Sequence, residues 1–414
     1  MDHPRIAVVG GSLAGLRAAE QLRASGHVGP VTVYGAEAHA PYNRPPLSKD
    51  VLADPATLDA EAALSRLTFR RRSSVGDVDF RFSAEVLGVD LGAGRLAWRS
   101  VGGGDPAEGS GDFDGLVVAT GLRPRRLSAP GPERGRYVLR TVEDCLELRA
   151  AVAEPRRVVV VGAGFIGCEA ACTLAALGHD VTVVEPTGAP MNRVLGEQLA
   201  LAVQRHHERS GIRFVIGPGV TAFEGGDRVS EAVLDDGQRL PVDVVIEAVG
   251  SIPNTEWLAG TGLDLADGVL TDNDLAAVGA DRVVAVGDLA RFPNPIFDDV
   301  PRRVEHWSIP TDTAKRAAPT LVALVEGRRP DLPPFAPVPS FWSDQADLRF
   351  QSFGSPGLAD EVVVAEGDPD DLTAGVLTLH HRAGRHVGTV ALNLPPARQR
   401  ELRDAFVTPT EARN

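Results

Sequence analysis

The sequence contains few cysteines, and their scarcity excludes several kinds of site. Among its 414 residues there are three, Cys145, Cys168 and Cys172, and none of them forms a CxxC motif. Neither a dithiol redox centre nor a zinc knuckle is therefore indicated. Cys168 and Cys172 are four residues apart on an expected helix, where we expect them to be small apolar packing residues.

Targeting and membrane segments are also lacking. The first expected strand begins near Arg5, which leaves no room for the charged and apolar regions of a signal peptide. No apolar run approaches the about 20 residues of a membrane helix. Together with the few cysteines, these features indicate a cytoplasmic protein.

Positive charge is scarce relative to negative charge. The formal net charge of −14 argues against binding to nucleic acid or to an anionic membrane, although a local basic patch remains possible. The length suggests two or three domains, and a hydrophobic fraction of 43% can supply substantial cores.

The clearest motif lies between residues 157 and 185. The β-branched run Val158–Val161 predicts a buried parallel strand, and the helix pattern after it stops at Gly178. A second apolar strand follows and ends on Glu185. Between the first strand and the helix stands a Gly-x-Gly-x-x-Gly sequence, so the segment has the form of a βαβ dinucleotide site.

Each part of this motif suits a dinucleotide. Gly162 permits a tight turn, Gly164 lets a pyrophosphate approach the backbone, and Gly167 allows close packing of helix and strand. Glu185 can accept both ribose hydroxyls, and its carboxylate repels a 2′-phosphate. Only Arg193 among the next ten residues could bind such a phosphate, so the sequence favours NADH over NADPH.

A second motif of this kind lies near the start of the sequence. It comprises Gly10–Gly15, in which Ser12 takes the place of the middle glycine. The helix Leu13–Ala24 and the strand Val31–Tyr34 are expected to follow. No acid ends this strand directly, and Glu37 is either the ribose ligand or a surface acid.

The two motifs together indicate a function. Dinucleotide folds about 150 residues apart suggest one tightly held flavin dinucleotide and one exchanging nicotinamide dinucleotide. A duplicated fold with one inactive site is the alternative.

Three further segments contribute to this hypothesis. The stiff loop Pro41–Lys49 ends in a cation that suits an electron-rich reduced flavin, and Ser48 is expected to cap the helix after it. Asp288 follows an apolar strand and is either a ligand for a sugar-like polyol chain or a simple turn acid. Ser308 is expected to start a helix that Pro319 should kink or break.

The last part of the chain predicts a small α+β domain. Pro330–Pro339 is expected to be a stiff linker, and the glycine-rich stretch 102–111 a flexible hairpin tip. Expected strands are Leu348–Phe353, Glu361–Glu366, Gly375–His381 and His386–Leu392, followed by a helix, Pro396–Phe406.

Taken together, these residues resemble a known family along nearly the whole sequence. It comprises the FAD-dependent NADH–ferredoxin reductases of bacterial monooxygenase and ring-hydroxylating dioxygenase systems, including the putidaredoxin-reductase and rubredoxin-reductase types. The most specific matches are Arg44–Lys49 (RPPLSK), Glu305–Trp307 (EHW) and Phe341–Gln345 (FWSDQ). Further matches are Gly10–Gly15, Pro41–Asn43, Ala119–Gly121, Leu139–Thr141 with Asp144, Gly162–Glu169, Val249–Asn254 and Gly287–Asp288. The sequence departs from the family pattern at Asn43, where aspartate is usual, and at Ile309–Pro310, where Asn-Ala is frequent.

The resemblance implies an α/β fold with two Rossmann-like dinucleotide-binding domains and a C-terminal α+β interface domain. The expected boundaries are 1–118 with 249–326 for the FAD domain, 119–248 for the NAD domain and 327–414 for the C-terminal domain. NADH would pass hydride to the flavin, which would release electrons singly to a 2Fe–2S ferredoxin or another small iron–sulfur protein. Lys49 would lie beside flavin N5 and pair with Glu169, which would keep it charged. We expect a monomer or a weak homodimer.

The resemblance also implies the residues that bind each cofactor, and it implies no metal ligands. Those expected to bind FAD are Gly10, Ser12, Leu13, Ala14, Gly15, Glu37, Arg44, Pro46, Lys49, Ala119, Thr120, Gly121, Arg123, Gly287, Asp288, Glu305, His306 and Trp307. Those expected to bind NAD are Gly162, Gly164, Phe165, Ile166, Gly167, Glu169, Glu185 and Gly250.

Other functions share this layout. Disulfide and peroxide reductases need a cysteine next to the flavin, and the first 140 residues contain none. An NADH-sensing flavoprotein of the apoptosis-inducing-factor type and a rubredoxin reductase are the remaining alternatives. A basic patch for an acidic ferredoxin would involve Arg302 and Arg303 beside Trp307, whereas Arg70–Arg72 are expected to form a solvated face.

The position of Glu185 leads to a testable prediction. Glu185→Arg should shift the preference toward NADPH, because it replaces a carboxylate that repels the 2′-phosphate with a cation that can bind it. The measurement is the ratio of kcat/KM for NADH to that for NADPH. An unchanged ratio would count against Glu185 as the ribose ligand.

Overall fold

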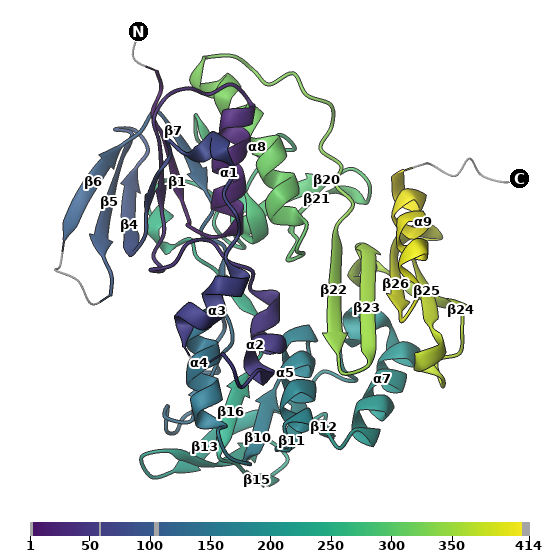
Figure 1. Ribbon diagram of the computed structural model, residues 1–414. Helices are drawn as coiled ribbons and strands as arrows, with labels where there is room; N and C mark the ends of the chain where they lie inside the picture. Colours follow the sequence, from purple (N-terminus) through teal and green to yellow (C-terminus); the bar gives the residue numbers. More distant parts are fainter. Residues whose placement is uncertain (1–2, 58, 103–106, 408–414) are drawn as a thin grey trace, which may run out of the picture. The chain divides into compact units, whose positions relative to one another are not determined.

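The computed structural model describes residues 3–57, 59–102 and 107–407. The chain divides into two compact units (Figure 1). The first comprises Met1–Asn43, Leu67–Arg123 and Pro253–Pro339, and the second comprises Arg44–Arg66, Pro124–Ile252 and Ser340–Asn414. Residues 103–106, in the centre of the expected hairpin tip, lie outside the described part, and residues 108–111, also expected in the flexible tip, belong instead to strand β6 (Glu108–Asp112).

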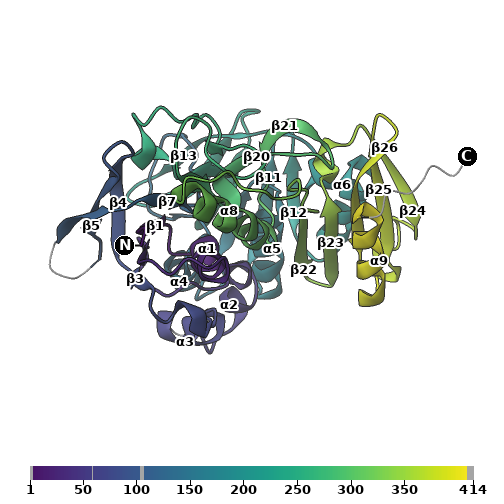
Figure 2. The ribbon, with the colours of Figure 1, turned by 90° about the horizontal axis from the view of Figure 1, so that it is seen from above.

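A five-stranded parallel sheet forms the core of the first unit. Its order is β19-β7-β1-β2-β3, and β1 has parallel partners on both sides. All four residues of β1 are buried, as expected for an apolar strand at the centre of a sheet covered on both faces. The bounds are β1 Ile6–Val9, β2 Val31–Tyr34, β3 Asp79–Arg81, β7 Gly115–Val118 and β19 Val283–Ala285. Helix α1 (Leu13–Ala24) has the predicted bounds and lies beside α8 (Ile309–Val325) in both Figure 1 and Figure 2.

Helix α8 differs from its prediction at one point. It begins after Ser308 as expected, but it continues unbroken through Pro319 to Val325, so a break at Pro319 was the wrong expectation. The loss of one hydrogen bond and the ring clash cost about 3 kcal/mol. Thr320 and Leu321, directly after Pro319, are fully buried, and burying one large apolar side chain offsets about 1.5–3 kcal/mol. Burial therefore holds the helix together across the proline.

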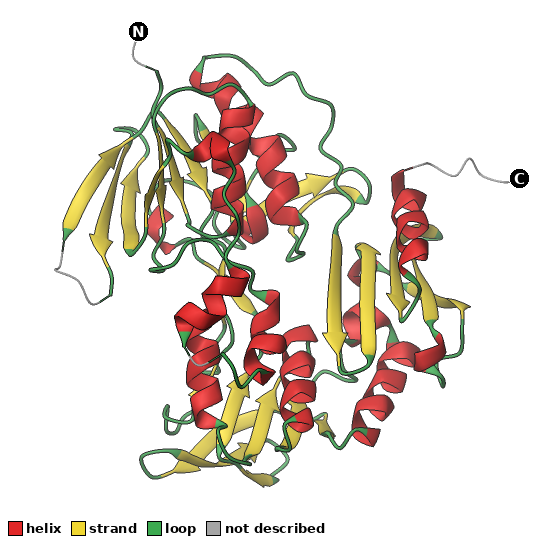
Figure 3. Cartoon of the chain, in the orientation of Figure 1, coloured by secondary structure: helices red, strands yellow, loops and turns green. Residues whose placement is uncertain are grey.

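Two smaller sheets complete the first unit. One is antiparallel, with β4 Ala84–Asp90, β5 Arg95–Ser100 and β6 Glu108–Asp112; the other contains β18 Val269–Leu270, β20 Ala290–Asn294 and β21 Asp298–Arg303. The predicted stiff segment Pro330–Pro339 has no helix or strand and is part of a long loop (Figure 3). It is nevertheless anchored, because Phe335 is buried and exchanges two hydrogen bonds of 2.7 and 2.9 Å with the side chain of Asn273.

A second parallel sheet forms the core of the second unit. Its order is β12-β11-β10-β16-β9, with β10 Arg157–Val161, β11 Asp180–Glu185, β12 Arg213–Ile216, β16 Val244–Glu247 and β9 Arg136–Tyr137. Helix α5 (Phe165–Ala176) follows β10, and Gly178 after it has a φ of +88°, as the helix-stop prediction requires. The other helices before residue 340 are α2 Asp50–Ala53, α3 Ala60–Leu67, α4 Val142–Ala151, α6 Asn192–Leu195 and α7 Glu197–Arg209. An antiparallel sheet holds β13 Val220–Gly225, β14 Val229–Leu234 and β15 Arg239–Pro241, and the short strands β8 Leu122–Pro124 and β17 Ser251–Pro253 pair with each other.

The end of the second unit is an antiparallel sheet of five strands. Its order is β22-β23-β26-β25-β24, and helix α9 (Pro396–Val407) packs against β23. The four predicted strands are present as β23 Leu348–Gly354, β24 Glu361–Glu366, β25 Val376–Arg382 and β26 Arg385–Leu392. Strand β22 (Ser340–Gln345) is an addition, since its sequence was recognised only as a motif. The predicted fold class, two Rossmann-like folds with a C-terminal α+β part, is confirmed.

No helix in the described residues is long and apolar enough to cross a membrane.

Candidate functional site

The glycine loop of the first unit is closed by backbone contacts that no side chain could tolerate. Gly10 has a φ of +123°, and a Cβ there would lie 2.1 Å from the carbonyl oxygen of Ala119. A Cβ on Gly15 would lie 1.9 Å from the carbonyl oxygen of Gly10. Ser12 is the N-cap residue of α1, and its side chain makes no capping hydrogen bond. The loop therefore leaves the first N–H groups of α1 available to an anion.

Two other predicted segments meet this loop within the same unit. Gly287 follows β19 with a φ of +77°, and a Cβ there would lie 2.9 Å from Cβ of Ala14. Ala119–Gly121 follows the neighbouring strand β7 and touches Gly10. Because carboxyl ends of parallel strands share one edge, Asp288 lies on that edge with both turns. A cradle of this form, which added Cβ atoms would fill, fits the dinucleotide of FAD.

Other predicted flavin residues in this unit have protein partners. The carboxylate of Glu37 accepts a 2.6 Å hydrogen bond from the hydroxyl of Tyr42. Arg123 pairs with Glu256 at 2.5 Å.

Asn43, where the family usually has aspartate, buries its Oδ1 without a hydrogen-bond partner among the described residues. An acceptor of this kind is one that a bound cofactor can satisfy.

The EHW segment combines an acid, a neutral ring and an exposed indole. Glu305 forms an ion pair with Arg303 at 2.8 Å, and 42% of Trp307 is exposed. Desolvation lowers the pKa of His306 to about 4, so its ring is neutral at pH 7.

The proposed basic patch beside Trp307 has little unbalanced charge. Arg303 also pairs with Asp267 at 2.7 Å, and Arg302 pairs with Asp298 at 2.5 Å. Arg70–Arg72, by contrast, are exposed, as expected for a solvated face.

The second unit repeats the same glycine geometry. Gly162 has a φ of +103°, and a Cβ there would lie 2.4 Å from the carbonyl oxygen of Ala248. A Cβ on Gly167 would lie 2.1 Å from the carbonyl oxygen of Gly162. A Cβ on Gly164, the N-cap residue of α5, would meet nothing within 4 Å. The first and third glycines thus close the loop, while the second leaves room for a pyrophosphate.

Glu185 lies at the end of β11 and turns back to this loop. Its Oε2 accepts a 2.9 Å hydrogen bond from the backbone N–H of Ala163, and its Oε1 accepts one of 2.6 Å from the hydroxyl of Thr187. The carboxylate is therefore fixed beside the glycine loop. Arg193, the one cation among the ten residues after Glu185, lies beside Gly357 in the 3-10 turn between β23 and β24, with its Nε 3.6 Å from the position that a Cβ of Gly357 would take.

The remaining predicted NAD residues flank the loop. Ile166 is 51% exposed in the first turn of α5, whereas the ring of Phe165 packs edge-on against Phe341 at 4.7 Å between centroids. Gly250 follows β16 with a φ of +98°.

The second unit also contains the ion pair between the two predicted catalytic residues. Lys49 Nζ lies 2.6 Å from Glu169 Oε2, with 15% and 7% of the side chains exposed. The ammonium also donates to the carbonyl oxygen of Pro45 at 3.2 Å. Ser48 was expected to cap the helix after it, but its hydroxyl donates instead to Glu169 Oε2 at 2.5 Å. A local capping rule could not detect this contact with a residue 121 positions away.

The RPPLSK segment is held in place by hydrogen bonds to the residue before the α4 cap and to helix α5. Arg44 donates to the carbonyl oxygen of Arg140 at 2.7 Å, directly before the Thr141–Asp144 capping box of α4. The hydroxyl of Thr173 on α5 donates to the carbonyl oxygen of Ser48 at 2.8 Å. The backbone on both sides of Lys49 is thereby fixed, and Pro46 stiffens it further.

Besides Ser48, sequence reasoning missed a second partner of Glu169. The hydroxyl of Ser343 on β22 donates to Glu169 Oε1 at 2.6 Å, and Gln345 donates to Ser343 at 3.2 Å. The signal was present, since residues two apart on a strand share one face, and both are polar in a specific motif. It was not used because the segment had not been recognised as a strand.

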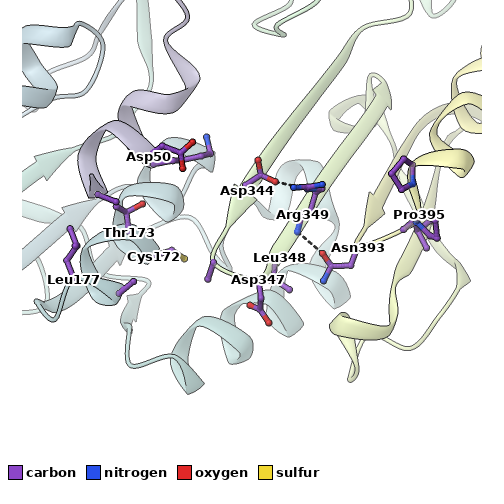
Figure 4. A pocket seen from close by; sticks show the side chains of 16 residues that line it. Asp50, Cys172, Thr173, Leu177, Asp344, Asp347, Leu348, Arg349, Asn393 and Pro395 are labelled. Carbon is purple, nitrogen blue, oxygen red and sulfur yellow. Dashed lines mark hydrogen bonds and ion pairs between the residues drawn. The ribbon is translucent and has the colours of Figure 1, made fainter. Parts of the chain in front are cut away.

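An open groove borders the ion pair. Its volume is about 860 Å³, and Figure 4 shows its walls, formed by α2, the end of α5, the β22–β23 turn and the segment after β26. Lys49 and Cys172 line it together with Asp344, Asp347 and Arg349. The part of the chain that the structure describes contains no cluster of three or more histidine, cysteine or acidic side chains that could hold a metal ion.

Comparisons with known proteins agree with one another. The pyridine nucleotide-disulphide oxidoreductase family matches residues 4–314, and the reductase C-terminal family matches residues 340–410. A probable ferredoxin reductase of Castellaniella defragrans is 35% identical over 396 residues, covering 94% of this chain and 91% of that protein. The crystal structure of a ferredoxin reductase for the CYP199A2 system of Rhodopseudomonas palustris is 32% identical, covers 94% and 91% of the two chains and has a TM-score of 0.83. The putidaredoxin reductase in a covalent complex with putidaredoxin is 26% identical, covers 97% and 93% and has a TM-score of 0.84.

The three thiols provide a testable prediction about redox chemistry. All are free and buried, and burial raises the pKa of Cys145 and of Cys172 to about 12 and that of Cys168 well above its ordinary value. Because the thiolate is the reactive form, the native thiols should react with iodoacetamide at pH 8 about 1,000-fold more slowly than free cysteine. Mass spectrometry before and after denaturation measures this. A rapidly labelled thiol in the native enzyme would instead support disulfide chemistry.

Proposed function

This chain belongs to the pyridine nucleotide-disulphide oxidoreductase family, and we propose that it passes electrons from NADH through FAD to a small iron–sulfur ferredoxin. The family expected from the sequence motifs is thus confirmed, and so are the enzyme class, a ferredoxin reductase, and the cofactors, FAD and NAD(P)H. The choice of NADH, the residues at work and the identity of the acceptor belong to the proposal.

The observation that carries the proposal is the buried pair of Lys49 and Glu169 in the unit that contains the second glycine loop. A flavin, when bound, accepts two electrons as hydride and can release them one at a time. The ammonium of Lys49 would stabilise the negative charge that reduction creates. Glu169 pairs with that ammonium at 2.6 Å and so holds it in place.

The first glycine loop supplies the residues that would hold FAD. Backbone N–H groups at the start of α1 would receive the pyrophosphate, and the carboxylate of Asp288 would receive hydroxyls of the ribityl chain. Ser12 in place of glycine is compatible with this role, because it is the N-cap residue of α1 and its hydroxyl makes no capping bond there. Trp307, 42% exposed, would flank the flavin or the acceptor.

The second glycine loop would hold NADH. Glu185 supports this choice over NADPH, since its carboxylate is fixed beside the loop and repels a 2′-phosphate. We also propose the three-domain division given above, a monomer or weak homodimer, and a location in the cytoplasm.

The assay that tests the function couples two reactions. NADH-driven reduction of cytochrome c should be slow with the enzyme alone and should rise when an added 2Fe–2S ferredoxin carries electrons between them. Ferredoxins and rubredoxins from the same genome distinguish the acceptor class. Slow turnover with each of them, together with a long-lived complex of reduced flavin and NAD⁺, would favour an NADH-sensing flavoprotein instead.

Lys49 itself provides a sharper prediction. Lys49→Ala should slow flavin reduction by NADH roughly 10- to 100-fold, at or below the loss typical of one electrostatic donor, while FAD remains bound. Stopped-flow absorbance of the flavin measures the rate. Lys315→Ala is the matched control, because Lys315 is the only other lysine and 59% of its side chain is exposed. A wild-type rate in the Lys49 variant would eliminate the proposed role.

A further inference from the structure

A line of buried hydrogen bonds runs from Glu169 into the C-terminal sheet. Ser343 Oγ donates to Glu169 Oε1 at 2.6 Å, and Gln345 Nε2 donates to Ser343 Oγ at 3.2 Å. Beyond them, His207 Nε2 on α7 lies 2.9 Å from Gln345 Oε1. Ser343, Gln345 and His207 are each no more than 1% exposed. The line joins three elements of the second unit, α5, β22 and α7 (Figure 1).

One proton arrangement satisfies every group in this line. Burial lowers the pKa of His207, so the ring is neutral at pH 7 and carries a single N–H. Gln345 Oε1, 2.9 Å from Nε2, can only accept, so Nε2 carries the N–H and donates to it. Nδ1 is then an acceptor, and the thiol of Cys172, whose Sγ lies 3.6 Å away, donates to it; the pKa of this thiol is raised to about 12, so it keeps its proton. Besides Cys172, the titratable groups nearest this ring are His206 and Asp347, which lie 2.7 Å apart.

In this arrangement each hydrogen bond of the line is donated in the direction of Glu169, and the amide of Gln345 also donates to Met191 Sδ at 3.3 Å. The thiol donates to the imidazole, the imidazole to the amide, the amide to the serine hydroxyl and the hydroxyl to the carboxylate. Each bond places the positive end of a dipole toward the anion, and neighbouring bonds in such a chain polarise one another. Oε1 is occupied by Ser343, and Oε2 by Ser48 and Lys49, so the carboxylate has one orientation.

We propose that Ser343, Gln345 and His207 are positioning residues that hold the Glu169 carboxylate in one orientation, toward Lys49. The C-terminal sheet then completes the reductive site and does not serve only as a surface for a partner. The FWSDQ segment has this role through its serine and glutamine. The significance for catalysis rests on the function proposed above for Lys49, but the positioning itself can be measured separately.

The experiment uses the presence of only two lysines in the chain. Brief acetylation of the FAD-loaded enzyme with acetic anhydride, followed by mass spectrometry, gives the reactivity of Lys49 relative to Lys315. Ser343→Ala should raise this ratio about three- to tenfold, because removing a donor leaves the carboxylate free to turn and loosens the ion pair that shields the Lys49 amine. Ser343→Thr, which keeps the hydroxyl, should return the ratio toward the wild-type value.

A matched control comes from the same sheet. Ser352 on β23 is 1% exposed, and its hydroxyl has no hydrogen-bond partner within the described part of the chain, so Ser352→Ala should leave the ratio unchanged. Gln345→Met removes the next donor while keeping the side-chain length, and should raise the ratio less than Ser343→Ala does.

The kinetic readout separates this proposal from the preceding one. In Ser343→Ala the limiting rate of flavin reduction should fall, while the NADH concentration for half-saturation stays constant. A wild-type acetylation ratio in both Ser343→Ala and Gln345→Met would overturn the positioning role. A raised ratio with an unchanged reduction rate would support positioning and overturn the catalytic role of Lys49.

Discussion

The buried carboxylate of Glu169 is the constraint on which the second unit depends. Taking an ion out of water costs several kcal/mol unless charges and hydrogen bonds replace its hydration. Here the replacement comes from Lys49, Ser48 and Ser343, which are far apart in the sequence. The segment before α2, the nucleotide helix α5 and strand β22 must therefore meet for any of them to be stable in place. The fold and the site are specified by the same contacts.

The two glycine loops show how one steric solution can serve two purposes. Gly10 and Gly162 face the same kind of carbonyl oxygen, and Gly15 and Gly167 close on them in the same way. The loops differ at the middle position, where one has Ser12 and the other Gly164. They also differ in the acid, because Glu185 contacts its own loop directly, whereas Glu37 accepts a bond from Tyr42. Backbone closure is thus common to both loops, whereas the middle residue and the contact of the acid are particular to each.

Sequence patterns predicted what local physics determines. The bounds of α1, the end of α5 at Gly178 and the apolar central strands follow from periodicity and glycine chemistry. The patterns failed where contacts between residues far apart in the sequence determine the structure. Ser48 meets a general capping rule, but a buried carboxylate on another helix takes its hydroxyl. Strand β22 was not recognised because its buried positions, Ser343 and Gln345, are polar and so give no apolar alternation. Its stability comes from pairing with β23 and from the network around Glu169.

The identity of the cation at position 49 has a physical reason of its own. Only two of the 42 basic residues are lysines, and the rest are arginines, so a lysine in the core of the site is not a matter of composition. An ammonium is a compact point charge that can donate to both Glu169 and the carbonyl oxygen of Pro45. A guanidinium is planar, broader and permanently charged, with five donors to satisfy. The space bounded by Glu169, Pro45 and the groove therefore suits the smaller cation.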